Sequence, residues 1–171
     1  QEAQEKHSAI GIKARWHCIG HLQTNKVKKA VEIFDIIQTV DSVKLAVEID
    51  KRAGTIGKKM PLLIEINSAR EENKSGVYPE KAMELIEGIS HFENIIVVGL
   101  MTMGPVTDDV EEMRPYLRLT RRLFEEIGAL EIKNVEMKYL SMGMSDSYRV
   151  AIEEGSNMVR LGTIIFGERK Q

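Results

Sequence analysis

The stretch Met158-Val159-Arg160-Leu161-Gly162-Thr163 carries the most weight for the fold, because it joins a short strand to a glycine-hydroxyl turn. Alternate residues of a strand point to the same side, so Arg160 and Gly162 are expected to face one space. A guanidinium there can bond a ring nitrogen or an anion, and Gly162 with the amides after it leaves room for a phosphate. The stretch therefore predicts a small phosphorylated-ligand site.

A second turn of the same kind occurs earlier, in Leu140-Ser141-Met142-Gly143-Met144-Ser145. Two such turns after consecutive strands, one with an inward arginine, favour an anion site between them. The alternative is that the turns cap the following helices, for which Ser145 would suffice, and both roles are compatible. Paired phosphate-type turns after the last two strands are typical of α/β barrels.

Short apolar runs alternate with longer amphipathic stretches along the whole chain. The predicted strands are Trp16–Leu22, Phe34–Val40, Leu62–Asn67, Ile95–Thr102, Glu136–Ser141 and Met158–Leu161. The predicted helices are Asn25–Ile33, Ser42–Ile56, Pro79–Ser90, Val110–Ile127 and Asp146–Glu154. Repeated strand-helix units imply parallel strands joined by right-handed crossovers. Six strands suit an open doubly wound sheet or part of an eight-stranded barrel, and the two turns favour the barrel.

Length and composition predict a single α/β domain over residues 1–171. The net charge is −2, with 24 basic and 26 acidic residues, so neither nucleic acid nor an anionic membrane is expected as the main partner. The apolar runs are too short for a membrane helix. The single cysteine, Cys18, excludes an internal disulfide and fits a reducing cytosol, so we expect a cytoplasmic protein.

Three further segments have polar or soft side chains at predicted strand ends. His17 could lie at the opening of a ligand pocket, or it could be a hydrogen-bonded residue of the barrel interior. A zinc site is not expected, because no set of cysteines or carboxylates accompanies it. Asn67 leads into the charged loop 68–76, which is either a ligand-facing lid or a solvated connection. Met101 lies at a strand end, where methionine is more often core filler than a ligand contact.

Taken in order, five segments closely resemble the pyridoxal-phosphate homeostasis protein family, the single-domain relatives of the alanine racemase N-terminal barrel. They are residues 16–26, 67–76, 99–102, 140–146 and 159–169, and Cys18 is a minor departure. The resemblance implies a (β/α)8 TIM-type barrel that holds pyridoxal 5′-phosphate at the carboxyl ends of its strands. It implies Ser141, Gly143, Gly162 and Thr163 around the phosphate, Arg160 at the pyridine nitrogen, and Asn67, Met101 and His17 around the pocket.

One departure from the family is large. The family's Schiff-base lysine follows the first barrel strand in a Val-Ser-Lys-type segment, and this sequence contains no such segment. The opening residues 1–6 resemble the family's second barrel helix, so the first two βα units are expected to be absent, most simply by omission from a longer protein. Lys26 and Lys74 match other positions and are not expected to replace the lysine. No catalytic residue is therefore predicted, and the cofactor can be absent from this chain.

The resemblance implies a protein of pyridoxal-phosphate homeostasis with little or no catalysis of its own, as a monomer or weak homodimer. An arginine at the ring nitrogen disfavours its protonation and weakens the ring as an electron sink. The alternative is an amino-acid racemase, which needs acid/base groups on both faces of its substrate. A third reading is a structural fragment that binds no cofactor.

Overall fold

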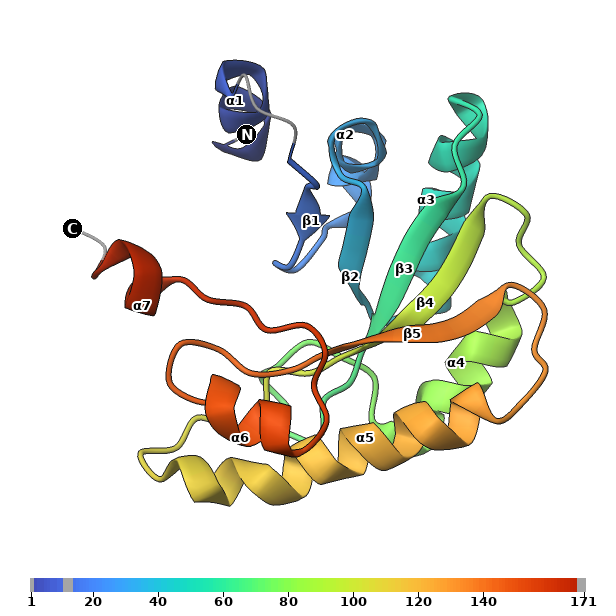
Figure 1. The fold of residues 1–171 in the computed structure, drawn as a ribbon. Helices are drawn as coiled ribbons and strands as arrows, with labels where there is room; N and C mark the ends of the chain where they lie inside the picture. The colour runs from blue at the N-terminus through green and yellow to red at the C-terminus, as the bar shows by residue number, and fades with distance from the viewer. Residues whose placement is uncertain (1, 11–13, 169–171) are drawn as a thin grey trace.

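The computed structural model describes residues 2–10 and 14–168, and its centre is a curved sheet of parallel strands (Figure 1). The strands are β1 (His17–Cys18), β2 (Ile36–Val40), β3 (Met60–Glu65), β4 (Ile95–Met101) and β5 (Val135–Ser141). They lie side by side in sequence order, and every neighbouring pair is parallel. A doubly wound sheet reverses its strand order at a switch point. The order found here has no reversal, which is how the wall of an α/β barrel is wound.

The helices are α1 (Glu2–Ala9), α2 (Val27–Ile33), α3 (Val43–Thr55), α4 (Ala82–Ile89), α5 (Arg114–Gly128), α6 (Tyr148–Glu153) and α7 (Thr163–Phe166). Three of them continue from 3-10 turns: η1 (Thr24–Lys26), η2 (Pro79–Lys81) and η3 (Val110–Met113). The five predicted helices are confirmed in position. Ser42 caps α3 as expected, since its hydroxyl accepts from the Leu45 amide at 3.4 Å. The short α7 has no counterpart in the predicted set of helices.

The prediction of six strands is wrong by one. Met158–Leu161 forms only an isolated bridge, between Ser141 and Met158. The reason lies in the partner strand, which ends where Gly143 takes a φ of 89° and turns the chain away. A Cβ on Gly143 would lie 2.6 Å from the Cβ of Ala151, so the turn requires glycine.

The first predicted strand is shorter than expected. Only His17 and Cys18 of Trp16–Leu22 pair with β2. Beyond them the Gly20 carbonyl accepts a hydrogen bond from the Thr39 hydroxyl at 2.9 Å instead of a strand amide. The chain thus leaves the sheet after two residues and enters η1.

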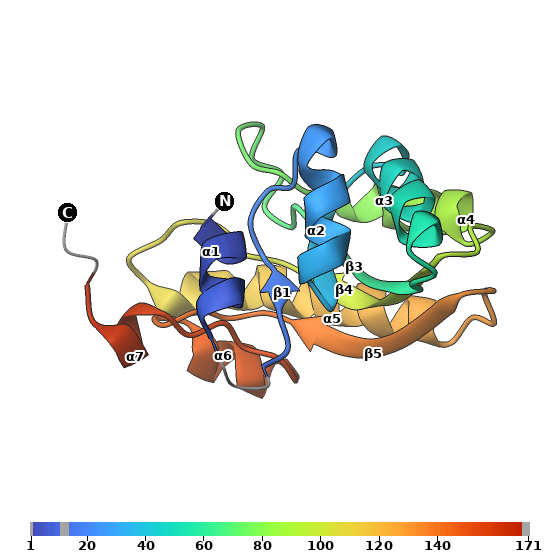
Figure 2. The same ribbon diagram turned by 90° about the horizontal axis from the view of Figure 1, so that it is seen from above.

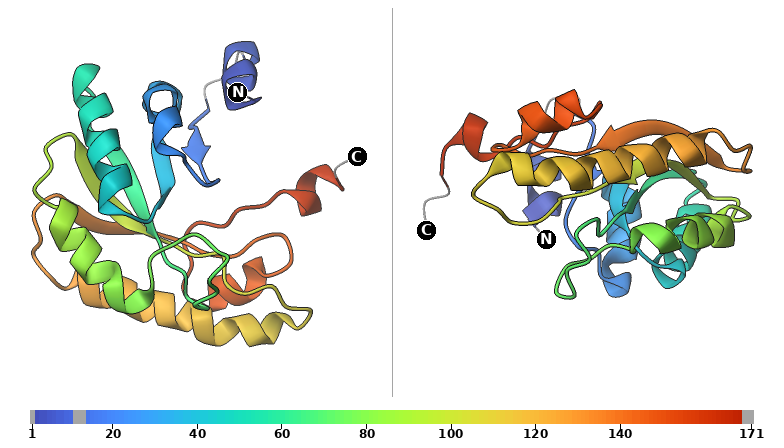
Figure 3. Two further views of the ribbon diagram at one scale, coloured as in Figure 1. Left: turned by 180° about the vertical axis from the view of Figure 1, so that it is seen from behind. Right: turned by 90° about the horizontal axis from the view of Figure 1, so that it is seen from below.

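The two faces of the sheet are covered differently. Helices α2, α3, α4 and α5 lie along the outer side of the curved sheet (Figures 1, 2 and 3). They enclose the main core, which includes Ile49, Leu62 and Leu100, all fully buried. A smaller apolar cluster on the inner face contains Leu63 and Met101. None of the helices in the described residues has the length and apolar character that a membrane crossing requires.

Candidate functional site

Polar side chains form a layer on the inner face of the sheet, at the carboxyl ends of its strands. Gln38 of β2, Glu65 of β3 and Ser141 of β5 are all buried. Each lies two residues beyond an inner-face apolar or aromatic residue of its strand, which places it on the same side. The inner face is therefore apolar below and polar at the edge where parallel α/β folds bind ligands.

Arg160 reaches into this layer and is held there by three hydrogen bonds. Its Nη1 donates to the Ser141 carbonyl at 3.0 Å and to the Ser141 hydroxyl at 2.8 Å, and its Nη2 donates to the Thr102 carbonyl at 2.9 Å. Burial lowers the pKa of Arg160 to about 10, while the nearby Glu65 acts in the opposite direction. A guanidinium has five N–H donors. Two remain, one on Nε and one on Nη2, without a partner among the described residues.

The hydrogen bonds continue from Arg160 across the sheet in one direction. A guanidinium can only donate, so the Ser141 hydroxyl accepts a hydrogen bond from Arg160. The hydroxyl in turn donates a hydrogen bond to Gln38 Oε1, at 2.7 Å. The Gln38 amide nitrogen then donates to His17 Nδ1 at 2.9 Å. This arrangement needs a neutral His17 with its proton on Nε2. Burial, the largest influence, lowers the pKa of His17 and favours that state.

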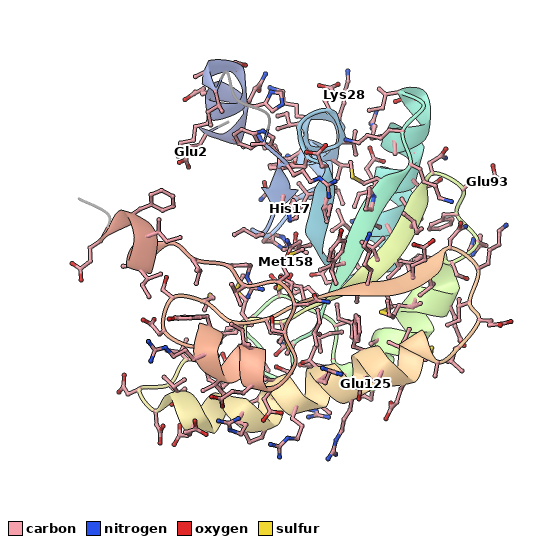
Figure 4. All side chains as sticks on the ribbon, viewed as in Figure 1. Glu2, His17, Lys28, Glu93, Glu125 and Met158 are labelled. Carbon is pink, nitrogen blue, oxygen red and sulfur yellow. The ribbon has the colours of Figure 1, made fainter. Side chains whose placement is uncertain are left out.

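A cleft of about 750 Å³ opens above this chain of hydrogen bonds. Its lining includes His17, Gln38, Arg160, Gly162 and Thr163. Figure 4 labels His17 on β1 and Met158 on the segment after α6. Both side chains contact the Gln38 amide, since the Met158 sulfur lies 3.3 Å from its nitrogen. The cleft thus has a guanidinium on one wall and a neutral imidazole on another.

The glycine turn at the rim of this cleft is organised by Ser145. The Ser145 hydroxyl accepts from the Gly162 amide at 3.2 Å and from the Ile164 amide at 3.3 Å. The space around Gly162 is open, because a Cβ built there would meet nothing within 4 Å. The Thr163 hydroxyl forms no hydrogen bond within the described ranges. Backbone amides and hydroxyls around open space are the usual components of an anion site.

The structure brings together four of the eight predicted site residues. His17, Arg160, Gly162 and Thr163 all line the larger cleft. Ser141, Gly143 and Met101 are buried behind it: the Ser141 hydroxyl is used by Arg160 and Gln38, and Met101 belongs to the inner apolar cluster. Asn67 lies elsewhere, on the wall of a second cavity.

The side chain of Asn67 holds the loop 68–76 in place. Its Nδ2 donates to the carbonyls of Glu71 and Lys74, at 2.8 and 3.3 Å, and its Oδ1 accepts from the Glu71 amide at 3.1 Å. The Lys74 ammonium pairs with Glu71 at 2.7 Å and donates to the Gly104 carbonyl at 3.1 Å. The loop is thus held by several hydrogen bonds and forms part of the wall of the second cavity.

This second cavity has a volume of about 260 Å³ and contains Glu65 in its wall. Burial first, and then the charge of Asp41, raise the pKa of Glu65 to about 7, while Arg160 opposes the shift. Sequence reasoning overlooked Glu65, Gln38 and the organising role of Ser145. A lone carboxylate in the apolar run Leu62-Leu63-Ile64-Glu65-Ile66 is the one signal that could have identified Glu65.

Known proteins resemble this chain in sequence and in fold. The family described as the alanine racemase N-terminal domain matches residues 1–170. The pyridoxal phosphate homeostasis protein of Aquifex aeolicus is 44% identical over 171 residues, which cover 99% of this chain and 74% of that protein. The corresponding protein of Haemophilus influenzae is 38% identical over 172 residues, covering 99% of this chain and 72% of its own length.

Solved structures agree with the sequence relatives. PipY of Synechococcus elongatus, solved with PLP bound, superposes with a TM-score of 0.87 at 31% identity, covering 98% of this chain and 78% of PipY. An alanine racemase of Clostridium difficile shares the fold, with a TM-score of 0.75 at 20% identity over 99% of this chain and 44% of the racemase. By sequence and by structure, the chain belongs to the pyridoxal phosphate homeostasis protein family.

Proposed function

We propose that this chain binds pyridoxal 5′-phosphate in the larger cleft and serves cofactor homeostasis, with little or no catalysis of its own. The observation that carries the proposal is the guanidinium of Arg160, fixed by three hydrogen bonds with two donors left over, beside the open turn at Gly162. PipY, a relative with 31% identity, has been solved with PLP bound.

The residues of the larger cleft fit this cofactor. A volume of about 750 Å³ lies within the range of small-molecule sites, about 300–1,000 Å³. In our proposal Arg160 donates to the pyridine nitrogen, while Ser145, Gly162 and Thr163 surround the phosphate. Ser141 and Gly143 contribute from behind, by holding Arg160 and by shaping the turn.

The remaining predicted residues support the pocket at a distance. In our proposal His17 contacts the ring from β1 through its Nε2 proton, and Met101 supports the floor of the pocket from the inner apolar cluster. Asn67 acts by holding the loop 68–76 rather than by touching the cofactor.

The protein groups in the cleft favour retention over reaction. When bound, the cofactor supplies an aldehyde for amine chemistry and a ring that can accept electrons. Arg160 still carries its charge at neutral pH, because its pKa is lowered only to about 10. A cation there keeps a proton off the ring nitrogen, so the ring is a weaker electron sink. No lysine lines the larger cleft in the part of the chain that the structure describes.

The test is binding of pyridoxal 5′-phosphate to the 171-residue chain, measured by equilibrium dialysis. We expect Arg160→Ala to weaken affinity at least tenfold, or about 1.4 kcal/mol, because a charge-assisted hydrogen bond is lost. Arg149→Ala is the matched control, since Arg149 is exposed on α6 and, among the described residues, its side chain contacts the hydroxyl and ring of Tyr148. Equal affinity of the wild type and Arg160→Ala would contradict the proposal.

Catalysis is tested separately by exchange of the α-proton of L-alanine in deuterated water. We expect the rate with protein and cofactor together to equal the rate with free cofactor. Exchange at an enzymatic rate would instead establish the racemase alternative.

We further propose a single-domain cytoplasmic protein that works as a monomer or weak homodimer and binds neither nucleic acid nor membranes. The support is the near-neutral net charge of −2 and the single cysteine, Cys18. Sedimentation of the purified chain at several concentrations tests the oligomeric state.

A further inference from the structure

Glu65, in the wall of the second cavity, has a carboxylate oxygen that the protein itself leaves unsatisfied. Oε2 of Glu65 is buried, and it is the one buried side-chain oxygen or nitrogen in the described residues without a hydrogen-bond partner. The whole residue is 7% exposed. A buried acceptor with no donor destabilises the fold, so such atoms are rare and usually have a ligand, a water or a function.

The polar neighbours of Glu65 in this cavity are already engaged. The Asn67 amide is used by the loop 68–76. The Ser68 hydroxyl bonds the Thr102 hydroxyl at 3.0 Å, and Thr102 donates to the Ile66 carbonyl. Lys74 is bonded to Glu71 and to the Gly104 carbonyl. Arg160 acts on Glu65 through its charge but donates its hydrogen bonds to Ser141 and Thr102. A molecule in the cavity can therefore supply the donor that the Glu65 carboxylate lacks.

The electrostatics at Glu65 favour a cation. Asp41 lies near it at the end of β2 and adds a second negative charge, while Arg160 approaches from the larger cleft. His21 and Lys74 are the other titratable groups in the wall, and His21 is bonded to Ser75. A single carboxylate is too small a ligand set for a hard divalent cation, which takes about six or more oxygens.

We propose that this cavity is a binding site for a small primary ammonium ligand, with the carboxylate of Glu65 as its partner. An ammonium group provides three donors, which suits a carboxylate that accepts no hydrogen bond from the described residues. Ile19, Ile66, Ala69 and Met103 provide apolar wall for a short carbon chain. The site goes beyond the proposed cofactor function and does not require the cofactor. It adjoins the larger cleft, because Ile19 and Met103 line both.

The proposal has a pH signature. Because the pKa of Glu65 is raised to about 7, the carboxyl is largely neutral at pH 6 and largely ionised at pH 8. An alkylammonium, with a pKa near that of lysine at about 10.4, stays charged throughout. Affinity should therefore rise with pH, by up to about tenfold per unit below pH 7, and level off above pH 8.

The experiment is an NMR titration of the 171-residue chain with n-propylammonium chloride at pH 8, with 1-propanol as the neutral probe. We expect saturable shifts of amides around Glu65 with the ammonium and much weaker ones with the alcohol. Glu65→Gln should weaken n-propylammonium binding at least tenfold. Glu72→Gln, which alters an exposed carboxylate of the loop 68–76, is the matched control and should change nothing.

A second variant tests the charge argument. Asp41→Asn leaves the effect of burial on the pKa of Glu65 in place and removes the smaller effect of the neighbouring charge, which also raises it. The variant should still bind n-propylammonium, and the rise of affinity with pH should move to lower pH. Potassium chloride that matches n-propylammonium in shifts and in dependence on Glu65 would overturn the proposal. So would affinity that falls as the pH rises from 6 to 8, or equal affinity in Glu65→Gln.

Failure of this proposal is distinguishable from failure of the cofactor proposal. Dialysis with pyridoxal 5′-phosphate on the same protein samples reports only on the larger cleft. Loss of n-propylammonium binding in Glu65→Gln with cofactor affinity unchanged supports the second site, whatever the result for Arg160→Ala.

Discussion

Arg160, which is partly buried, and Glu65, which is buried, are two charged side chains at the same edge of the sheet with opposite hydrogen bonding. Arg160 donates three hydrogen bonds, to the ends of β4 and β5. The Glu65 carboxylate accepts none among the described residues, and its Oε2 is fully enclosed. In both cases burial shifts the pKa toward the neutral form, to about 10 for Arg160 and about 7 for Glu65. At neutral pH the arginine keeps its charge, whereas Glu65 is only partly ionised.

The difference in hydrogen bonding means that Arg160 is already oriented for a ligand, whereas the Glu65 carboxylate has no fixed partner. Fixing Arg160 through backbone carbonyls means that a ligand meets an oriented donor and does not have to order it. Glu65 lies in the wall of a cavity whose other buried polar side chains already have hydrogen-bond partners. The free energy of unfolding should therefore depend on the protonation of Glu65 and on any ligand bound in that cavity. The following predictions test this contrast, from the largest expected effect to the smallest.

The largest effect is expected from Glu65→Gln on the pH dependence of stability. A folded-state pKa raised from 4.5 to about 7 means that the protonated form stabilises the fold below pH 4.5 and that this contribution is lost as the pH rises through 7. That pKa change corresponds to about 3 kcal/mol. The variant should therefore gain about 3 kcal/mol over the wild type between pH 4.5 and pH 8, measured by urea unfolding. A constant difference between the two proteins would disprove an ionisable, unsatisfied Glu65.

Ser141→Ala should have the next largest effect, because it breaks the support of Arg160. It removes one acceptor from the guanidinium and leaves Gln38 Oε1 without its donor. We expect a loss of about 2 kcal/mol in the free energy of unfolding, together with weaker binding of pyridoxal 5′-phosphate. Ser8→Ala on the exposed α1 is the control and should be neutral. Full stability in Ser141→Ala would mean that Arg160 is held by the two backbone carbonyls alone.

Thr163→Ala should affect binding without affecting stability. The Thr163 hydroxyl is exposed and bonds nothing among the described residues, so the free energy of unfolding should not change. Loss of one hydrogen bond to a phosphate should weaken cofactor affinity by about 1 kcal/mol. The dissociation constant of inorganic phosphate, obtained from its competition with the cofactor, should rise by a similar factor. An unchanged dissociation constant for phosphate would place the phosphate away from this turn.

The smallest effect concerns His17 at the far end of the chain of hydrogen bonds. Its pKa is lowered from 6.5 by burial, so the neutral form stabilises the folded state. This contribution is complete above pH 6.5 and is lost as the pH falls through the folded-state pKa. The ring proton resonances of His17 should titrate with a midpoint below 6.5. A midpoint above 6.5 would indicate that Gln38 presents its oxygen to the ring, opposite to the direction inferred from Arg160.

Much of the fold was predictable because it depends on local patterns. The helices follow from amphipathic periodicity and from caps such as Ser42, which act within a few residues. Strand ends were less predictable. Met158–Leu161 has the composition of a strand, but whether it pairs depends on how far β5 continues before Gly143 turns.

The sequence by itself determined the alternation of strands and helices and the presence of Arg160 and Gly162 in one cleft, although the strand assumed for Met158–Leu161 does not form. Only the tertiary structure decided which side chains work there. Ser141 bonds Gln38, 103 residues away in sequence, so its hydroxyl is used inside the protein and Ser145 organises the turn. That the Glu65 carboxylate lacks a hydrogen-bond donor could be seen only from the positions of its neighbours in the folded protein. Hydrogen-bond partners across the sheet depend on which strands are adjacent and where each one ends, and no local spacing encodes that.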